Sequence, residues 1–217
     1  MAHRTLARPA EQSDLVKGSR FRAWVAPIDA QADAEAWVAR VRASEPAAHH
    51  VAWAWRFGGL QRWSDDGEPG GTAGRPMLEV LLKRDLDRVV AVVARVFGGV
   101  RLGAGGLARA YGGAVARALD AAAVVEVPDR RAFALRAPFA DADALLRLLA
   151  DPAVDLGPPR FAADGLHLSG TALASAADDL AARAGEATRG RVRWSWVGDE
   201  AASASGTAAA PDDAQRK

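Results

Sequence analysis

The chain contains no cysteine, which excludes disulfide bridges, thiolate metal ligands and cysteine nucleophiles. It also lacks a long hydrophobic run: the longest, Val89 to Ala94, falls far short of the roughly 20 residues that cross a bilayer. The first 15 residues are interrupted by charged side chains and a proline, so they form no secretory signal. These absences predict a cytoplasmic location.

Net charge is nearly absent as well, at +1 over 217 residues, which argues against strong nonspecific binding to nucleic-acid duplexes. Hydrophobic residues make up 50% of the chain and charged residues 25%, a balance typical of soluble globular proteins. The length suits one large domain or two small ones.

The first part of the chain predicts a mixed sequence of strands and helices. Strands are expected at 20–26, 50–57, 60–64 and 88–97, and Gly58-Gly59 marks a hairpin between the second and third of them. Helices are expected after Asp29, through 77–82 with Thr72 as a candidate cap, and over 107–122. The 88–97 segment is apolar on both faces, which is typical of a central strand.

After Val127 the pattern restarts in the order β-α-β-β-α-β, which is typical of a ferredoxin-like domain. Its strands are expected at 131–137, 154–161, 166–170 and 192–196, and its helices at 141–150 and 175–184. The fold class is therefore α+β with two domains, 15–127 and 128–198. Residues 1–14 are expected to be flexible, and the tail 199–217 to be disordered because it has no large apolar side chain.

Glycines are concentrated in the N-terminal half: 13 of the 21 lie between Gly58 and Gly113. They form a first glycine loop, 64–76, and a second glycine loop, 98–106. Residues 103–108 match the dinucleotide pattern G-x-G-x-x-A, but residues 98–102 separate that pattern from the strand, where a dinucleotide turn is tight. A broader alternative remains, in which exposed amides and Arg95, Arg101 and Arg109 bind phosphate or another anion. Otherwise the glycines only allow tight helix–sheet contact.

The first glycine loop carries three carboxylates, Asp65, Asp66 and Glu68. They suit a hard cation such as Mg²⁺, but an acidic turn that caps the next helix explains them more simply and is favoured. His49 and His50 have no histidine partner at helical spacing, so no zinc site is predicted. No Ser/His/Asp motif is present, and no catalytic residue is assigned.

Alternating tryptophans beside arginines are found at 53–56 and 191–196, and they are interpreted as core aromatics with arginines on the wet face. A local basic collar surrounds the two glycine loops. It consists of Arg62, Arg75, Lys83, Arg84, Arg95, Arg101 and Arg109. Such a collar suits an RNA or ribosomal surface better than free DNA.

Taken together, several segments resemble the IMPACT/YigZ family. They are Gly18–Phe21, His49–Trp53, Ser64–Pro69, Gly71–Gly74, Pro76–Met77, the run "VARVFGGVRLG" from Val93 to Gly103, Gly105–Leu107 and Ala110–Gly112. The spacing is family-like over about 15–125. Phe97 departs from the pattern, since many members have a tyrosine there.

This resemblance implies a first domain like domain IV of elongation factor G, a fold shared with a ribosomal protein domain and with small-molecule kinases. It also implies a ferredoxin-like second domain and a general link to translation. Eukaryotic relatives regulate translation through an additional N-terminal domain that is not found in this sequence, so their mechanism is not carried over.

Two functions stay open at this point. The first is a non-enzymatic, translation-associated protein that contacts RNA, a ribosome or a translation factor through the glycine loops, with no cofactor. The second is an enzyme that binds a phosphorylated small molecule or nucleotide, with or without Mg²⁺. The candidate binding residues are the same for both: Asp65, Asp66, Glu68, Thr72, Arg75, Arg95, Gly98, Gly99, Arg101, Gly103, Gly105, Gly106 and Arg109.

Overall fold

The computed structural model describes residues 2–197 and divides into two compact units, 2–127 and the part of the chain that follows from Pro128. Both units combine helices with antiparallel sheets, so the fold is α+β. The tail expected to be disordered, 199–217, lies outside the described residues.

The N-terminal unit is built on a five-stranded sheet whose neighbouring strands are all antiparallel. In spatial order the strands are β2 (Ala10–Val16), β3 (Ser19–Pro27), β6 (Val89–Val96), β4 (His50–Phe57) and β5 (Leu60–Ser64). β6 is central and buried over its first seven residues, as its two apolar faces predict. The Gly58-Gly59 hairpin joins β4 to β5 as expected, with both glycines at positive φ.

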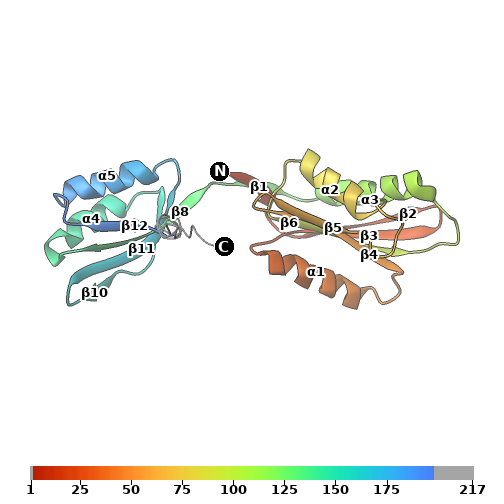
Figure 1. Cartoon of the computed structure of the whole chain (residues 1–217), viewed down its shortest axis with the longest axis horizontal. Coiled ribbons are helices and arrows are strands. Elements are labelled where there is room, and N and C mark those ends of the chain that lie inside the picture. Colours follow the sequence, from red (N-terminus) through yellow and green to blue (C-terminus); the bar gives the residue numbers. More distant parts are fainter. Residues whose placement is uncertain (1, 198–217) are drawn as a thin grey trace, which may run out of the picture. The chain divides into compact units, whose positions relative to one another are not determined.

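Helices cover both faces of this sheet (Figure 1). The helix α1 (Gln31–Ser44) packs on one face, where Val41 and Trp55 are buried. The helices α2 (Gly74–Lys83) and α3 (Gly103–Asp120) pack on the other face, where Phe21, Met77 and Tyr111 are fully enclosed. Burial of these large side chains is the main stabilising contribution to the unit.

The expectation of a flexible N-terminus is wrong. Residues His3–Leu6 form β1, which pairs with β7 (Val124–Val127) at the far end of the unit's sequence, and β2 begins at Ala10. Leu6 is only 2% exposed, so this segment contributes to the core. Pairing between strands about 120 residues apart leaves no local signal in the sequence.

The C-terminal unit has the strand and helix order that the sequence predicts. It consists of β8 (Arg130–Ala137), η1 (Phe139–Asp141), α4 (Ala142–Leu149), β9 (Val154–Leu156), β10 (Arg160–Ala162), β11 (Gly165–Leu173), α5 (Ala177–Ala187) and β12 (Arg193–Trp196). The sheet order is β10-β11-β8-β12, and β9 also pairs with β11. The single strand expected over 154–161 is divided in two because Pro158 and Pro159 cannot donate ladder hydrogen bonds.

The core of the C-terminal unit lies between its sheet and the pair α4 and α5. The predicted core role of the late tryptophans is confirmed: Trp194 stacks on Phe133 at 4.4 Å between ring centroids, and Trp196 meets Trp194 edge-on. Arg193 and Ser195, which alternate with the two tryptophans in sequence, are exposed. The alternation of β12 therefore separates an aromatic face from a wet face.

Candidate functional site

The two glycine loops meet at one end of the N-terminal sheet. The register pairs Arg20 with Val96, His50 with Arg95 and Trp53 with Ser64, so the β2–β3 turn, the start of β4 and the ends of β5 and β6 all lie together. We call this region the loop end; it comprises the turn at 17–18, His49 and His50, the two glycine loops and the start of α3 as far as Arg109.

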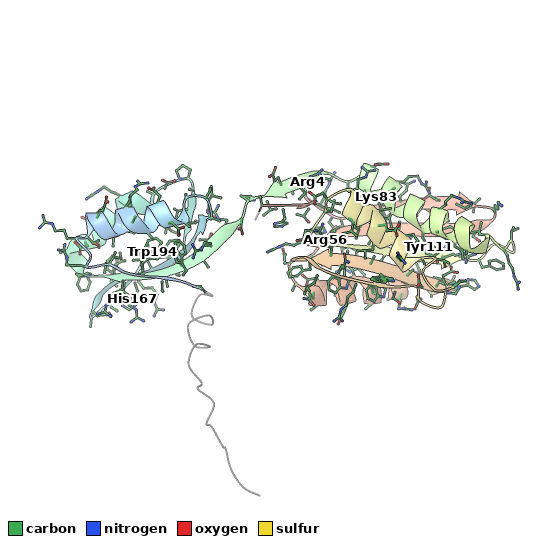
Figure 2. All side chains as sticks on the ribbon, turned by 45° about the horizontal axis from the view of Figure 1, so that its top comes forward. Arg4, Arg56, Lys83, Tyr111, His167 and Trp194 are labelled. Carbon is green, nitrogen blue, oxygen red and sulfur yellow. The ribbon has the colours of Figure 1, made fainter. Side chains whose placement is uncertain are left out.

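A buried carboxylate joins the two loops. The Glu68 side chain is 3% exposed, and its Oε1 accepts hydrogen bonds of 2.7 Å from both Arg95 Nη1 and the Tyr111 hydroxyl. Glu68 thus ties the first glycine loop to β6 and to α3, the elements that flank the second loop. Tyr111 lies between α3 and the sheet (Figure 2). Burial, together with the hydrogen bond to Glu68, raises the pKa of the Tyr111 hydroxyl far above its usual value.

Asp65 organises the first glycine loop from within. Its carboxylate accepts hydrogen bonds from the backbone amides of Gly71 (2.8 Å), Ala73 (2.9 Å) and Gly74 (2.8 Å), which include the first residues of α2. The expected capping role of Thr72 is therefore wrong. Thr72 is buried, and its hydroxyl donates to the Pro69 carbonyl at 2.6 Å. Asp65 takes that role because the loop folds back over it.

Asp66 attaches the first glycine loop to α1 and β4. Its carboxylate accepts hydrogen bonds from Arg42 Nη2 at 2.5 Å and from the Val51 amide at 2.6 Å, while His50 Nδ1 lies 2.9 Å from the Asp66 carbonyl oxygen. Burial disfavours the ionised form, but the hydrogen bonds from Arg42 and Val51 outweigh it and hold the pKa of Asp66 below its usual value.

The three carboxylates of the first loop therefore contact three separate sets of protein donors. Between residues 2 and 197, no group of three or more histidine or acidic side chains is placed to hold a metal ion. The favoured interpretation of an acidic turn that caps the next helix holds for Asp65, but Glu68 is buried and paired with Arg95 instead of solvated.

The second glycine loop begins with a glycine because the backbone of Gly98 lies very close to the backbone of Gly18. The Gly98 amide donates to Ser19 Oγ at 3.1 Å, and a Cβ on Gly98 would lie only 1.9 Å from the Gly18 carbonyl carbon. Gly99 and Gly103 have φ of +86° and +69°, which favour glycine. Gly105 and Gly106 belong to the first turn of α3. Further along the helix, Gly112 faces Pro76 of α2 and not the sheet, so it allows close helix–helix packing.

The predicted basic collar needs correction at Arg95. Arg95 is 5% exposed, lies over the rings of Phe21 and Phe97, and is bonded to Glu68, so it does not present its charge to a partner. Two other members are paired at the surface: Arg84 with Asp120, and Arg75 with Glu79 at 3.5 Å. A charged residue inside a strand apolar on both faces was a signal that Arg95 is buried.

What remains exposed and without an ion-pair partner among residues 2–197 at the loop end is Arg101, Arg109 and also Lys17, which sequence reasoning missed. Lys17 and Arg109 line a cleft of about 250 Å³ between the β2–β3 turn and the start of α3. Arg117, also in its lining, pairs with Asp14 at 2.8 Å. We call Lys17, Arg101 and Arg109 the loop-end cations. They leave net positive charge beside the second glycine loop.

These features define a two-unit α+β protein whose N-terminal unit holds paired glycine loops around a buried Glu–Arg–Tyr cluster. Residues 17–119 match the family model of the Impact N-terminal domain. A Thermus thermophilus protein described as an IMPACT family member in the pol 5′ region is 49% identical over 125 residues, which cover 58% of this chain and 68% of that protein. The chain belongs to the IMPACT family, which confirms the resemblance seen in the sequence.

Other relatives agree with this assignment. The Escherichia coli family member YigZ is 44% identical over 118 residues, covering 52% of this chain and 58% of YigZ. The Bacillus subtilis member YvyE is 41% identical over 125 residues and is likewise covered over 58% of its length. A crystal structure described as a hypothetical protein has a TM-score of 0.71 and 31% identity, covering 89% of this chain and 96% of that one.

Within residues 2–197, no helix is both long and apolar enough to cross a bilayer.

Proposed function

We propose that this protein is a non-enzymatic cytoplasmic binding protein that acts in translation and contacts RNA, on a ribosome or in a ribonucleoprotein, through the loop end of its N-terminal unit. The observation that carries the proposal is the group of loop-end cations Lys17, Arg101 and Arg109. All three are exposed and have no carboxylate partner among the described residues, and two of them line one cleft. Unpaired cations beside a cleft suit phosphate groups.

The rigidity of the loop end supports a role in recognition. The first glycine loop is held by Asp65 from within, by Asp66 from α1 and β4, and by Glu68 from β6 and α3. The second glycine loop is fixed against the β2–β3 turn through Ser19. A preorganised surface loses little conformational entropy when a partner binds.

The enzyme alternative, a phosphate- or nucleotide-binding protein like the small-molecule kinases, receives less support. A kinase needs a carboxylate for Mg²⁺, and the three clustered candidates are all occupied by protein donors. Thermal-shift screening with nucleotides and sugar phosphates separates the two functions, because a ligand at 100 times its Kd stabilises the folded state by about 2.7 kcal/mol. The proposal predicts no shift.

The architecture supports the family expectation for both units. If β9 and β10 are counted as one interrupted strand, the C-terminal unit has the β-α-β-β-α-β order of a ferredoxin-like domain, with α4 and α5 on one face of its sheet. We propose that it corresponds to the ferredoxin-like domain, and the N-terminal unit to the elongation factor G domain IV type, that the resemblance implies.

The experiment is salt-dependent binding of single-stranded RNA to the full chain. Arg101→Ala and Arg109→Ala should each weaken binding about fivefold and reduce the slope of log K against log salt by about 0.7, the contribution of one phosphate contact. Arg8→Ala removes the same charge from the opposite end of β2 and should have little effect. Equal effects of all three substitutions, or no binding at low salt, would contradict the proposal.

A further inference from the structure

The sheet of the C-terminal unit has one face that no helix in the described residues covers. Both α4 and α5 pack on the face formed by Phe133, Leu135 and Trp194. Figure 1 shows these helices together on one side of the sheet, and Figure 2 shows His167 on the other side. Strand side chains alternate between faces, so the residues between the core positions all point to this uncovered face.

A row of basic side chains crosses the uncovered face, one from each of four strands. The register places Arg160 of β10 opposite His167 of β11, His167 opposite Arg136 of β8, and Arg136 opposite Arg193 of β12. We call these four residues the cross-strand row. Because neighbouring strands lie about 4.8 Å apart, the row is about 14 Å long. Its members come from distant parts of the sequence, so no local sequence motif predicts the row.

Residues 2–197 balance the positive charge of the cross-strand row only in part, because Asp164 attracts Arg136 as well as His167. Arg136, Arg160 and Arg193 are exposed and make no hydrogen bond or ion pair within residues 2–197. The nearby acidic residue Asp164 contacts His167 Nε2 at 2.7 Å, and Asp155, two rows away on the same face, pairs with Arg130. Like charges directly opposite each other on neighbouring strands are destabilising. An anion along the row would relieve that repulsion.

The surface around the row is hollow, and its lining combines basic and serine residues with apolar ones, among them Leu168 and Trp194. The row lines a depression of about 410 Å³ together with Ala134, Ser169 and Ser195, which form the next row of the sheet. This adjoining row carries no aromatic side chain on which a base could stack. The side chains of these two rows therefore offer hydrogen-bond donors and positive charge to a backbone.

We propose that the cross-strand row binds the phosphodiester backbone of a single-stranded nucleic acid, without base preference. A single phosphate reaches two neighbouring members of the row, whereas cations spread over about 14 Å match a chain of successive phosphates. Ser169 supplies a further hydroxyl donor to phosphate or sugar oxygens, whereas the Ser195 hydroxyl already donates to the Ala134 carbonyl at 3.2 Å. The inference concerns a second surface on the other unit and shares no residue with the loop end.

The test compares two double substitutions in the full chain by fluorescence anisotropy, using oligouridylate and oligothymidylate of 20 nucleotides at several salt concentrations. Arg136→Ala with Arg193→Ala removes the centre and one end of the row. Arg147→Ala with Arg183→Ala removes the same charge from exposed positions on α4 and α5, on the covered side of the sheet. Circular dichroism checks that both variants remain folded.

We expect the row variant to weaken binding at least tenfold and to reduce the salt slope by about 1.4, the contribution of two single-strand phosphate contacts. The helix-side variant should stay within about twofold of the unsubstituted chain. Arg136→Lys with Arg193→Lys keeps the charge and should retain most of the affinity. If the chain binds oligouridylate more tightly than oligothymidylate, the preferred ligand is RNA. The opposite order of affinities identifies single-stranded DNA.

Equal weakening by the row and helix-side variants would overturn the inference, as would failure of the unsubstituted chain to bind either oligonucleotide. The double variant Arg101→Ala/Arg109→Ala keeps this result distinct from the proposed function. If only the row variant loses binding, the inference stands and the loop-end proposal fails. If only the loop-end variant loses binding, the reverse holds.

Discussion

The hydroxyl of Tyr111 donates a 2.7 Å hydrogen bond to the carboxylate of Glu68, which lies 43 positions earlier in the chain. This bond is buried and joins the first glycine loop to the helix that follows the second one. The loops therefore form one rigid unit rather than two independent flexible segments. The geometry of the loop-end cations depends on that unit, because α3 carries Arg109 and the segment before it carries Arg101.

Removing the hydroxyl tests this bond. Tyr111→Phe keeps the edge-on ring contact with Phe21 but leaves Glu68 with one donor fewer, so we expect unfolding to require about 1.5–3 kcal/mol less free energy. Urea denaturation measures the difference. Combined with Glu68→Ala, the two losses should add only in part, since both substitutions remove the Tyr111–Glu68 hydrogen bond. Full additivity would show that the two side chains are not coupled.

The close contact between the second loop and the β2–β3 turn predicts a difference between two glycines. Gly98→Ala places a methyl group 1.9 Å from the Gly18 carbonyl carbon, so we expect it to destabilise the fold by more than about 3 kcal/mol. Gly105→Ala, where the nearest neighbour is the mobile tip of Arg109 at 3.5 Å, should be neutral or stabilising by up to about 1 kcal/mol. Thermal unfolding of the two variants provides the comparison. Similar melting temperatures would contradict the observed backbone contact.

The role of Asp65 as the cap of α2 can be separated from that of Thr72. Asp65→Ala leaves three backbone amides without their acceptor and should destabilise the protein by about 2 kcal/mol. Thr72→Val removes one hydroxyl donor to Pro69, whose carbonyl keeps the Thr72 amide, and should cost about 0.5–1 kcal/mol. Amide hydrogen exchange at Gly71, Ala73 and Gly74 should accelerate only in the Asp65 variant. Acceleration in both variants would remove the distinction.

The lowered pKa of Asp66 predicts an acid-dependent contribution to stability. A carboxyl whose pKa is lower in the folded than in the unfolded state, where it is near 3.8, stabilises the protein above that value. The contribution disappears as the pH falls through the folded-state pKa. The stability difference between the unsubstituted chain and Asp66→Asn should therefore be largest at neutral pH and shrink below pH 3.8. Urea titrations at both ends of that range measure it, and a difference that is constant or grows in acid would be inconsistent with ionised Asp66 holding Arg42 and Val51.

Much of the fold was predictable because its signals are local. Alternation over His50 to Phe57 with Gly58-Gly59 after it identified the β4–β5 hairpin and its aromatic face. By contrast, β2 is a polar edge strand in which only Leu15 and Val16 are large and apolar. Its sequence therefore lacks the alternation of apolar and polar residues that would predict a strand. Among the described strands, β1 and β7 pair only with each other.

The sequence singled out the two glycine loops that lie together at one end of the sheet, but it did not predict which contacts each residue makes. Spacing could not show that Asp65 accepts amides six to nine residues later, because that bond exists only after the loop closes. Lys17 went unnoticed because the β2–β3 turn approaches α3 only in three dimensions. The cross-strand row likewise depends on strand register, which alternation alone does not determine.

Backbone-amide chemical shifts of the full chain during titration with oligouridylate test the loop-end proposal most directly. The account predicts progressive shifts at Lys17, at Arg101 and Arg109 and at the glycines between them, with these shifts reversed by added salt. If the chemical shifts of all these amides stay unchanged at an RNA concentration that saturates binding, the result would contradict the proposal.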